Sequence, residues 1–226
     1  MEEDEQFKLD ALQKIANSAP ISSVLDEKSA KRYILSFEKR LSENQQVRMQ
    51  DQVKTEQLID ADFGVFDAIQ TLKGFSDYPQ YISLLVSTQS IESIIGILDH
   101  ENIDLVIAVI DLIKELTDPD LFFIEPNSIL FAAELIKEKT ELQLIPCLKR
   151  LDENELDEQT GILNIMGILD NLLEVNATIV EQSLSQSESN DGSIFLKWLI
   201  NRISKGPYPE DQLLIDNKNL KDQNKD

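Results

Sequence analysis

Isoleucine, leucine and valine recur along residues 65–205 at helical spacing, without the alternation of a β-strand and with few glycines. A chain with this pattern buries one face of each helix against its neighbours, so it predicts stacked helix pairs and triplets. Such an array presents a long surface and no closed pocket. We therefore expect an all-α, armadillo/HEAT-like right-handed helical repeat array that binds partners.

The segment 102–118 shows the pattern most clearly. On a 3.6-residue helix its larger aliphatic side chains form one broad face, which we expect to be buried: Leu105, Val106, Val109, Ile110, Leu112, Ile113 and Leu116. The remaining side carries a narrow and mostly acidic stripe: Asp104, Ala108, Asp111, Glu115 and Asp118. Asn102 or Asp104 can cap the start of the helix, and Pro119 ends it.

Three apolar helices end at comparable places, each before a polar turn and a longer helix. The ends at Leu98, Leu151 and Ile203 are separated by 53 and 52 residues. This period suits three helices per unit and is longer than the roughly 40 to 47 residues of armadillo and HEAT repeats. It predicts units at about 59–118, 119–175 and 176–215, with helices near 62–73, 78–87, 90–99, 103–118, 126–139, 141–151, 155–175, 177–186 and 194–204.

The flanking segments differ from the repeats in composition. Residues 24–58 place Tyr33, Ile34, Phe37 and Leu41 on one side of a helix, which predicts an amphipathic lead-in that caps the array or docks on a partner. Residues 1–23 are acidic and polar, and we expect a mobile N-terminus. Residues 216–226 are too polar to complete a repeat, so they are expected to form a disordered tail.

The net charge of −21 comes from 42 acidic and 21 basic residues. Between Gly74 and Ile136 a single basic residue, Lys114, stands among 11 carboxylates. Such a surface repels nucleic acid and attracts basic segments in a salt-dependent manner. The alternative is that the acidic face only keeps the protein in solution.

Several kinds of site are absent from the pattern. A glycine-rich phosphate loop is missing, and the one histidine, His100, falls in a turn between helices, so no catalytic or cofactor-binding residue is predicted. The single cysteine, Cys147, lies in an apolar stretch and is expected to be a buried, inert thiol. Residues 152–158 are acidic but lack the glycine of a calcium loop, so no metal site is predicted. No segment approaches the roughly 18 apolar residues of a membrane helix.

Two polar stripes on the long helices are the candidate binding site. Residues 169–172 resemble the leucine-x-asparagine-leucine of armadillo third helices, in which the asparagine faces a concave groove and holds the backbone of an extended peptide. A groove lined by carboxylates prefers lysine and arginine side chains. The alternative is two hydrated helix faces. The predicted groove residues are Asp111, Glu115, Asp118, Asn164, Asn171 and Glu174.

The sequence also resembles a specific family. The run Leu98-Asp99-His100-Glu101-Asn102-Ile103-Asp104, continued to Asp118, is similar to the first repeat of the beta-catenin-like protein 1 family. Further similar blocks follow the family's order and extend the resemblance over roughly residues 24–215: residues 25–27, 34–40, 44–45, 150–153, 196–199 and Arg202.

The resemblance implies a nuclear, non-enzymatic armadillo-like protein that is associated with the spliceosome through the NineTeen complex. Members of that family bind basic nuclear-localisation segments of splicing factors, which implies such segments as partners here. Direct binding of nucleic acid or of membranes is not expected. Family members are more than twice as long and carry a basic import cluster that residues 1–24 lack, so we expect a nuclear protein that also occurs in the cytoplasm.

A second hypothesis treats the chain as a truncated paralogue that acts as a self-associating or cytosolic adaptor scaffold outside splicing. In that case an unfinished apolar end would form a homodimer. Trp198 lies at this end, at a spacing more typical of a core residue than of an exposed anchor for a partner.

Overall fold

A computed structural model describes residues 25–187 and 190–206, and this part of the chain is helical without any strand. The longer helices are α2 (Glu27–Arg48), α3 (Thr55–Lys73), α6 (Ile103–Leu116), α8 (Ile129–Lys137), α9 (Thr140–Arg150), α10 (Leu156–Gln186) and α11 (Asp191–Ser204). Shorter helices connect them: η1 (Gly74–Asp77), η2 (Pro79–Tyr81), α4 (Ile82–Ser87), α5 (Ile91–Gly96), η3 (Ile97–Asp99), α7 (Pro119–Ile124) and η4 (Pro126–Ser128).

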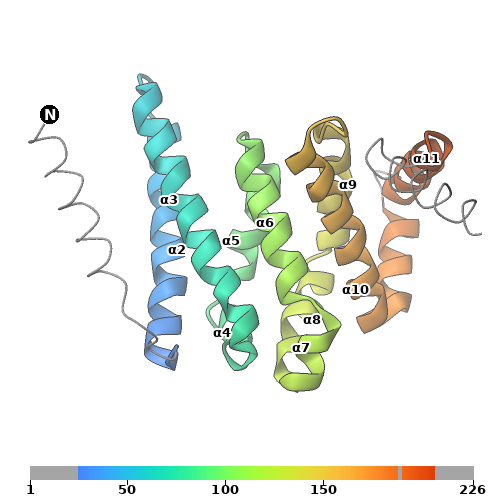
Figure 1. Cartoon of the computed structure of the whole chain (residues 1–226), viewed down its shortest axis with the longest axis horizontal. Helices are drawn as coiled ribbons and strands as arrows, with labels where there is room; N and C mark the ends of the chain where they lie inside the picture. Colours follow the sequence, from blue (N-terminus) through green and yellow to red (C-terminus); the bar gives the residue numbers. More distant parts are fainter. Residues whose placement is uncertain (1–24, 188–189, 207–226) are drawn as a thin grey trace, which may run out of the picture.

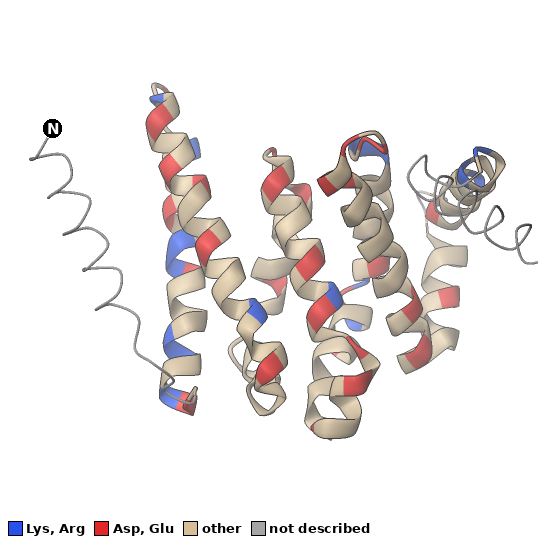
Figure 2. Cartoon of the chain, in the orientation of Figure 1, with Lys and Arg blue, Asp and Glu red and all other residues tan. Residues whose placement is uncertain are grey.

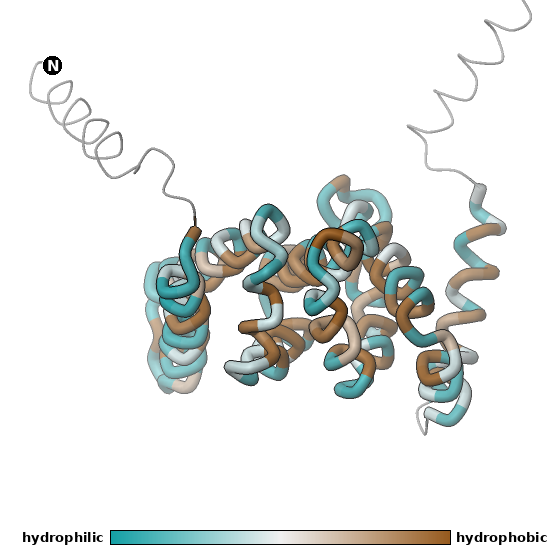
Figure 3. The backbone as a smooth tube through the Cα atoms, turned by 90° about the horizontal axis from the view of Figure 1, so that it is seen from below, coloured by the Kyte–Doolittle hydropathy of each residue, from teal (hydrophilic) through white to brown (hydrophobic). Residues whose placement is uncertain are grey.

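The helices form an array in which α3, α6 and α10 lie side by side along one face (Figure 1). Helix α2 packs on α3 at one end, and α11 lies at the other end. The view turned by 90° shows the helices in successive layers along the array (Figure 3). The all-α armadillo-like repeat array predicted from the sequence is confirmed.

Helix α6 is the central helix of the array, because it packs on α3 on one side and on α10 on the other. Every residue of its predicted buried face is buried, at 1% exposure or less. Ala108, which the sequence placed on the exposed stripe, is also buried. The apolar face of α6 is therefore wide enough to meet two neighbours, as a third helix of a stacked unit must.

The lead-in helix is amphipathic, as predicted. Ile34, Phe37 and Leu41 are buried against the array, whereas Tyr33 is 39% exposed and does not belong to the buried face. The helix ends at Arg48, and α3 already begins at Thr55, inside the predicted lead-in of residues 24–58. The predictions for residues 1–23 and 216–226, and for the end of the third unit beyond residue 206, lie outside the described residues.

Pro119 does more than end the preceding helix. It occupies the first turn of α7, a helix that the sequence analysis missed. Proline is tolerated there because the first amides of a helix have no partner within the helix. The Asp118 side chain caps α7 by accepting a hydrogen bond of 3.0 Å from the backbone N–H of Asp120.

Helix α10 is broken at Asn176, where φ is −159° and ψ is 80°, which agrees with the separate helices predicted at 155–175 and 177–186. By length and composition alone, α10 is the one described helix that could cross a membrane. Before the break, however, Ile162, Ile165 and Ile168 are buried within the array, which is the environment of a core helix.

The α11 end carries an apolar row on its outer side. Leu196, Ile200 and Ile203 follow one another at helical spacing and are all more than half exposed. Trp198 is partly buried and packs on the core, in agreement with its spacing.

Candidate partner-binding groove

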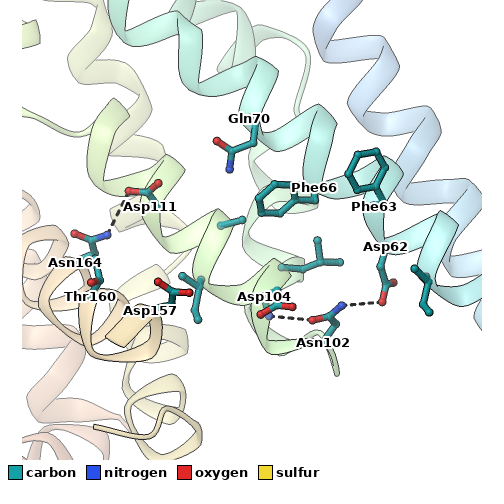
Figure 4. A pocket seen from close by; sticks show the side chains of 14 residues that line it. Asp62, Phe63, Phe66, Gln70, Asn102, Asp104, Asp111, Asp157, Thr160 and Asn164 are labelled. Atoms are coloured by element: carbon teal, nitrogen blue, oxygen red, sulfur yellow. Dashed lines mark hydrogen bonds between the residues drawn. The ribbon is translucent and has the colours of Figure 1, made fainter. Parts of the chain in front are cut away.

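A groove with a volume of about 780 Å³ runs along the face formed by α3, α6 and α10. Helix α6 forms its floor, and α3 and α10 form its two walls (Figure 4). The lining residues are Ile59, Asp62, Phe63, Phe66, Gln70, Asn102, Asp104, Leu105, Ile107, Ala108, Asp111, Asp157, Thr160 and Asn164.

The α3 wall is mainly apolar. Ile59, Phe63, Phe66 and Gln70 recur at a spacing of three or four residues, so they form one stripe along the helix. Ile59 is 60% exposed, Phe63 67% and Phe66 38%. Exposed aromatic and aliphatic side chains that gather in a groove are typical of a surface that binds a partner.

Two carboxylates of the groove have no ion-pair partner among the described residues. Asp104 lies in the first turn of α6, and Asp157 lies in the first turn of α10. Negatively charged side chains are common at such positions because the N-terminus of a helix carries a partial positive charge. Both carboxylates are exposed, so the groove offers negative charge beside its apolar wall.

Asp111 and Asn164 are the two predicted site residues that line the groove. Asp111 forms an ion pair with Lys73, and it accepts a hydrogen bond of 3.3 Å from the Asn164 side-chain amide. These contacts join α3, α6 and α10 across the groove. Much of the charge of Asp111 is therefore already compensated within the chain.

The other predicted acidic residues lie outside the groove lining. Glu115 and Glu174 are exposed further along α6 and α10. Asp118 caps α7, and its second oxygen lies 3.8 Å from Nζ of Lys114. Lys114 in turn lies across Gly167, where a Cβ would come within 2.5 Å of its side chain. The absence of a side chain at Gly167 thus lets the lysine cross from α6 to α10.

Asn171 does not face the groove, and this part of the prediction is wrong. Its side chain is 6% exposed, and its amide donates a hydrogen bond of 3.1 Å to the hydroxyl of Thr117, which is itself buried. The bond joins α10 to the end of α6. A polar side chain is tolerated in this interior position because it has a partner.

A polar network fixes the α2–α3 end of the groove. Asp62 accepts hydrogen bonds of 2.7 and 2.8 Å from Arg48, 2.6 Å from Asn44 and 2.8 Å from Asn102. Burial alone would raise the pKa of Asp62, but these donors outweigh it and lower the pKa. Because Asn102 also caps α6 through the N–H of Asp104, the network holds α2, α3 and α6 together.

His100 belongs to the same network and acts as the turn residue that the sequence suggested. Its Nδ1 accepts a hydrogen bond of 3.0 Å from the backbone N–H of Asn102, and its Nε2 lies 3.2 Å from Oδ1 of Asn44. The tautomer with the proton on Nε2 satisfies both contacts. Burial, followed by the nearby Arg48 guanidinium, lowers the pKa of His100.

The lowered pKa of His100 predicts an acid-sensitive fold. Below about pH 6.5 the unfolded chain binds a proton at this residue more readily than the folded chain, so the free energy of unfolding falls as the pH drops from 7.5 to 5.5. In the variant His100→Asn, which keeps an acceptor near Nδ1, this contribution is absent. Urea denaturation at both pH values measures the difference, and equal pH dependence in the two proteins would contradict it.

Two buried reactive groups lie apart from the groove. Cys147 is buried as predicted, and burial raises the pKa of its thiol to about 11, so it is a poor nucleophile. Glu141 is fully buried, neither of its carboxylate oxygens has a hydrogen-bond partner in the described part of the chain, and burial raises its pKa. Among the described residues no group of histidine, cysteine and carboxylate side chains could hold a metal ion.

The sequence analysis missed Phe63, Phe66 and Asp157 as groove residues. The signal was present, since α3 carries a second apolar stripe beside the buried one formed by Val65, Ile69 and Leu72. A helix with two apolar stripes must expose one of them unless both are covered. The exposed stripe is the one that faces the groove.

Stacked helices whose long members line one grooved face define an armadillo-type repeat protein. Residues 8–218 match the family of catenin-beta-like, Arm-motif containing nuclear proteins, and the chain belongs to this family. The resemblance noted in the sequence is thus confirmed.

Relatives from animals and yeast support this assignment. The beta-catenin-like protein 1 of Homo sapiens and that of Bos taurus are each 32% identical over 191 residues, which cover 84% of this chain and 33% of the relative. The beta-catenin-like protein 1 homolog of Schizosaccharomyces pombe is 27% identical over 178 residues, or 73% of this chain and 30% of the relative. The chain spans about a third of the length of these relatives.

Proposed function

We propose that this chain is a non-enzymatic binding module that takes a basic segment of another protein into the groove between α3, α6 and α10. Among the partners we include nuclear-localisation-type segments of splicing-complex proteins. The observation that supports this most directly is the combination of an exposed apolar stripe on α3 with two uncompensated carboxylates, Asp104 and Asp157.

The groove suits a segment that mixes lysine or arginine with apolar residues. The aliphatic stem of a bound lysine or arginine would lie on Phe63 or Phe66, and its charged end would reach Asp104 or Asp157. Glu115 and Glu174 would act on a segment long enough to extend beyond the groove. A partner without apolar side chains would leave the α3 wall exposed to water.

Charge reversal at the groove tests the proposal. In the variant Asp104→Lys/Asp157→Lys we expect the affinity for a fluorescein-labelled nuclear-localisation-type peptide to fall by at least about tenfold, because two attractive contacts become repulsive. Fluorescence anisotropy at two salt concentrations measures this, and the affinity of the unmodified chain should itself decrease with salt.

The matched control is Glu115→Lys/Glu174→Lys, which changes the net charge equally at two exposed carboxylates. We expect a decrease of about threefold or less for this variant, since both residues lie outside the groove lining. A larger effect at Glu115 and Glu174 than at Asp104 and Asp157 would place the binding site on the stripes predicted from the sequence. Unchanged binding in both variants would refute the groove as the peptide site.

The wider role proposed for this module is in pre-mRNA splicing, in association with the NineTeen complex, in the nucleus and also in the cytoplasm. Family membership supports this role, and the armadillo-type fold favours binding over catalysis. The test is affinity purification of the tagged chain from nuclear extract. We expect the unmodified chain to recover NineTeen-complex proteins and the variant Asp104→Lys/Asp157→Lys to lose them. Failure of the unmodified chain to recover these proteins would oppose the proposed role.

A self-associating scaffold is the second candidate function, and the exposed apolar row on α11 favours it. In that case two copies would bury Leu196, Ile200 and Ile203 against each other. Sedimentation velocity over a hundredfold range of concentration distinguishes the two functions. A dimer that is lost in Ile200→Asp would support the scaffold, and a monomer at all concentrations would exclude it.

A further inference from the structure

The side of α2 that faces away from the array carries a regular row of cations. Lys28, Arg32 and Lys39 are exposed, and the exposed Leu35 lies between them. The spacing of i, i+4, i+7 and i+11 is the same as that of the buried residues Ala30, Ile34, Phe37 and Leu41, displaced by about half a turn. The four residues, called here the α2 outer row, therefore form a straight line opposite the packed face.

This row contrasts with the charge of the rest of the molecule. Helix α2 has 22 residues and holds six of the 21 basic residues of the chain. Figure 2 shows lysine and arginine along α2, whereas aspartate and glutamate predominate along α3, α6 and α10. A chain with a net charge of −21 thus carries a local basic surface at one end of its array.

Contacts within the chain compensate little of this charge. Lys28 has no ion pair among the described residues, and Arg32 donates a hydrogen bond of 2.8 Å to the hydroxyl of Ser29. Lys39 lies 3.6 Å from Glu43, but the two side chains are 75% and 45% exposed, and such surface pairs contribute little. Leu35 is 66% exposed in the centre of the row. Asp26 interacts electrostatically with Lys28 and Arg32 and offsets part of their charge. The described residues nevertheless leave the whole α2 outer row exposed.

We propose that the α2 outer row binds an acidic helical segment of a partner protein. Carboxylates of that segment would pair with Lys28, Arg32 and Lys39, and an apolar side chain would cover Leu35. Charge complementarity carries this inference, because the row is basic within an acidic protein. Nucleic acid is the less favoured occupant, since a long polyanion would also experience the negative field of the remaining surface.

This surface is separate from the groove. The outer row lies on the side of α2 opposite its packed face, whereas the groove is lined by α3, α6 and α10. The groove takes positive charge and the row takes negative charge, so the two surfaces would select partners of opposite composition. An experiment can therefore refute the proposal for the groove without refuting that for the α2 outer row, and the reverse.

The experiment measures binding of a labelled amphipathic peptide with glutamates at i, i+4 and i+11 and leucine at i+7 to the full chain. At about 50 mM salt, where surface charges are weakly screened, we expect binding that falls by at least about tenfold in Lys28→Glu/Arg32→Glu/Lys39→Glu. The matched control Lys137→Glu/Lys149→Glu/Lys197→Glu alters exposed lysines elsewhere by the same charge, and its affinity should change by less than about twofold. Circular dichroism verifies that both variants fold.

Three further arms identify the occupant. Leu35→Ser should lower the affinity for the acidic peptide by about threefold. If neither Leu35→Ser nor the α2 charge-reversal variant changes this affinity, the proposal is overturned. A 20-nucleotide single-stranded RNA is tested in the same way. If it binds more tightly than the peptide and this binding is lost in the same charge-reversal variant, the occupant is nucleic acid and the proposal of a protein partner is overturned. A rise of tenfold or more in peptide affinity after neutralising Glu2, Glu3, Asp4 and Glu5 would show that the chain's own N-terminal segment occupies the row, which also overturns it.

Discussion

Replacing Phe131 with alanine lowers the free energy of unfolding by about 3 to 5 kcal/mol, the usual cost of removing a fully buried phenylalanine side chain. Phe131 has no exposed surface and lies on α8, a helix that packs on both α4 and α10. The cavity left by the ring would therefore lie between the first and second helical units. Chemical denaturation followed by circular dichroism measures the loss.

The matched control is Phe123→Ala, the same substitution at a side chain that is 86% exposed. Its effect should remain within about 0.5 kcal/mol, because little apolar surface leaves water at that position on folding. Equal losses of stability for Phe131→Ala and Phe123→Ala would mean that α8 does not bury Phe131 against the neighbouring helices.

Replacing Asp62 with alanine is expected to cost about 3 kcal/mol. The substitution leaves the guanidinium of Arg48 and the amides of Asn44 and Asn102 without their shared acceptor, and donors that lose their acceptor in a largely buried site are costly. Arg48 keeps one ion pair, of 3.0 Å with the exposed Glu101. The side chains of Arg48 and Asp62 are 23% and 15% exposed, so the effect should fall at the lower end of the range for buried pairs. Because the network joins α2 to α3 and α6, hydrogen exchange should increase along α2.

Asp60→Ala provides the comparison on the same helix, since the Asp60 side chain is exposed and forms no hydrogen bond or ion pair with the described residues. We expect a change of less than about 0.5 kcal/mol for this variant. The double variant Arg48→Met/Asp62→Leu adds a further check. If the cost of Asp62→Ala comes from unpaired donors, removing the cation together with the carboxylate should recover part of the lost stability.

Much of the fold could be predicted because periodicity reports directly on which helix faces are buried. The face of α6, the break near Asn176 and the lead-in helix all follow from the spacing of apolar residues. Helix α7 was missed because six residues are too few to display a period, and the proline at their start signals the end of one helix as readily as the start of another.

The groove was harder to predict than the fold, for two physical reasons. Phe63 and Phe66 have the spacing of core residues, and a sequence does not reveal which of two apolar stripes meets a neighbour. Asn171 illustrates the converse, because a polar side chain on a long helix is buried when a distant residue, here Thr117, supplies its hydrogen-bond partner. Both cases depend on contacts between residues far apart in the chain, which local patterns do not encode.

The two ends of the array differ in the polarity of their outer helices, so they differ in which further helices can pack on them. An additional apolar helix could pack on α11, because it would cover side chains that are already apolar. The same apolar helix packed on α2 would desolvate Lys28, Arg32 and Lys39 without offering them hydrogen-bond acceptors. A further apolar layer is therefore favoured at the α11 end of the solenoid, whereas the α2 end suits only a surface whose carboxylates replace the water lost from its cations.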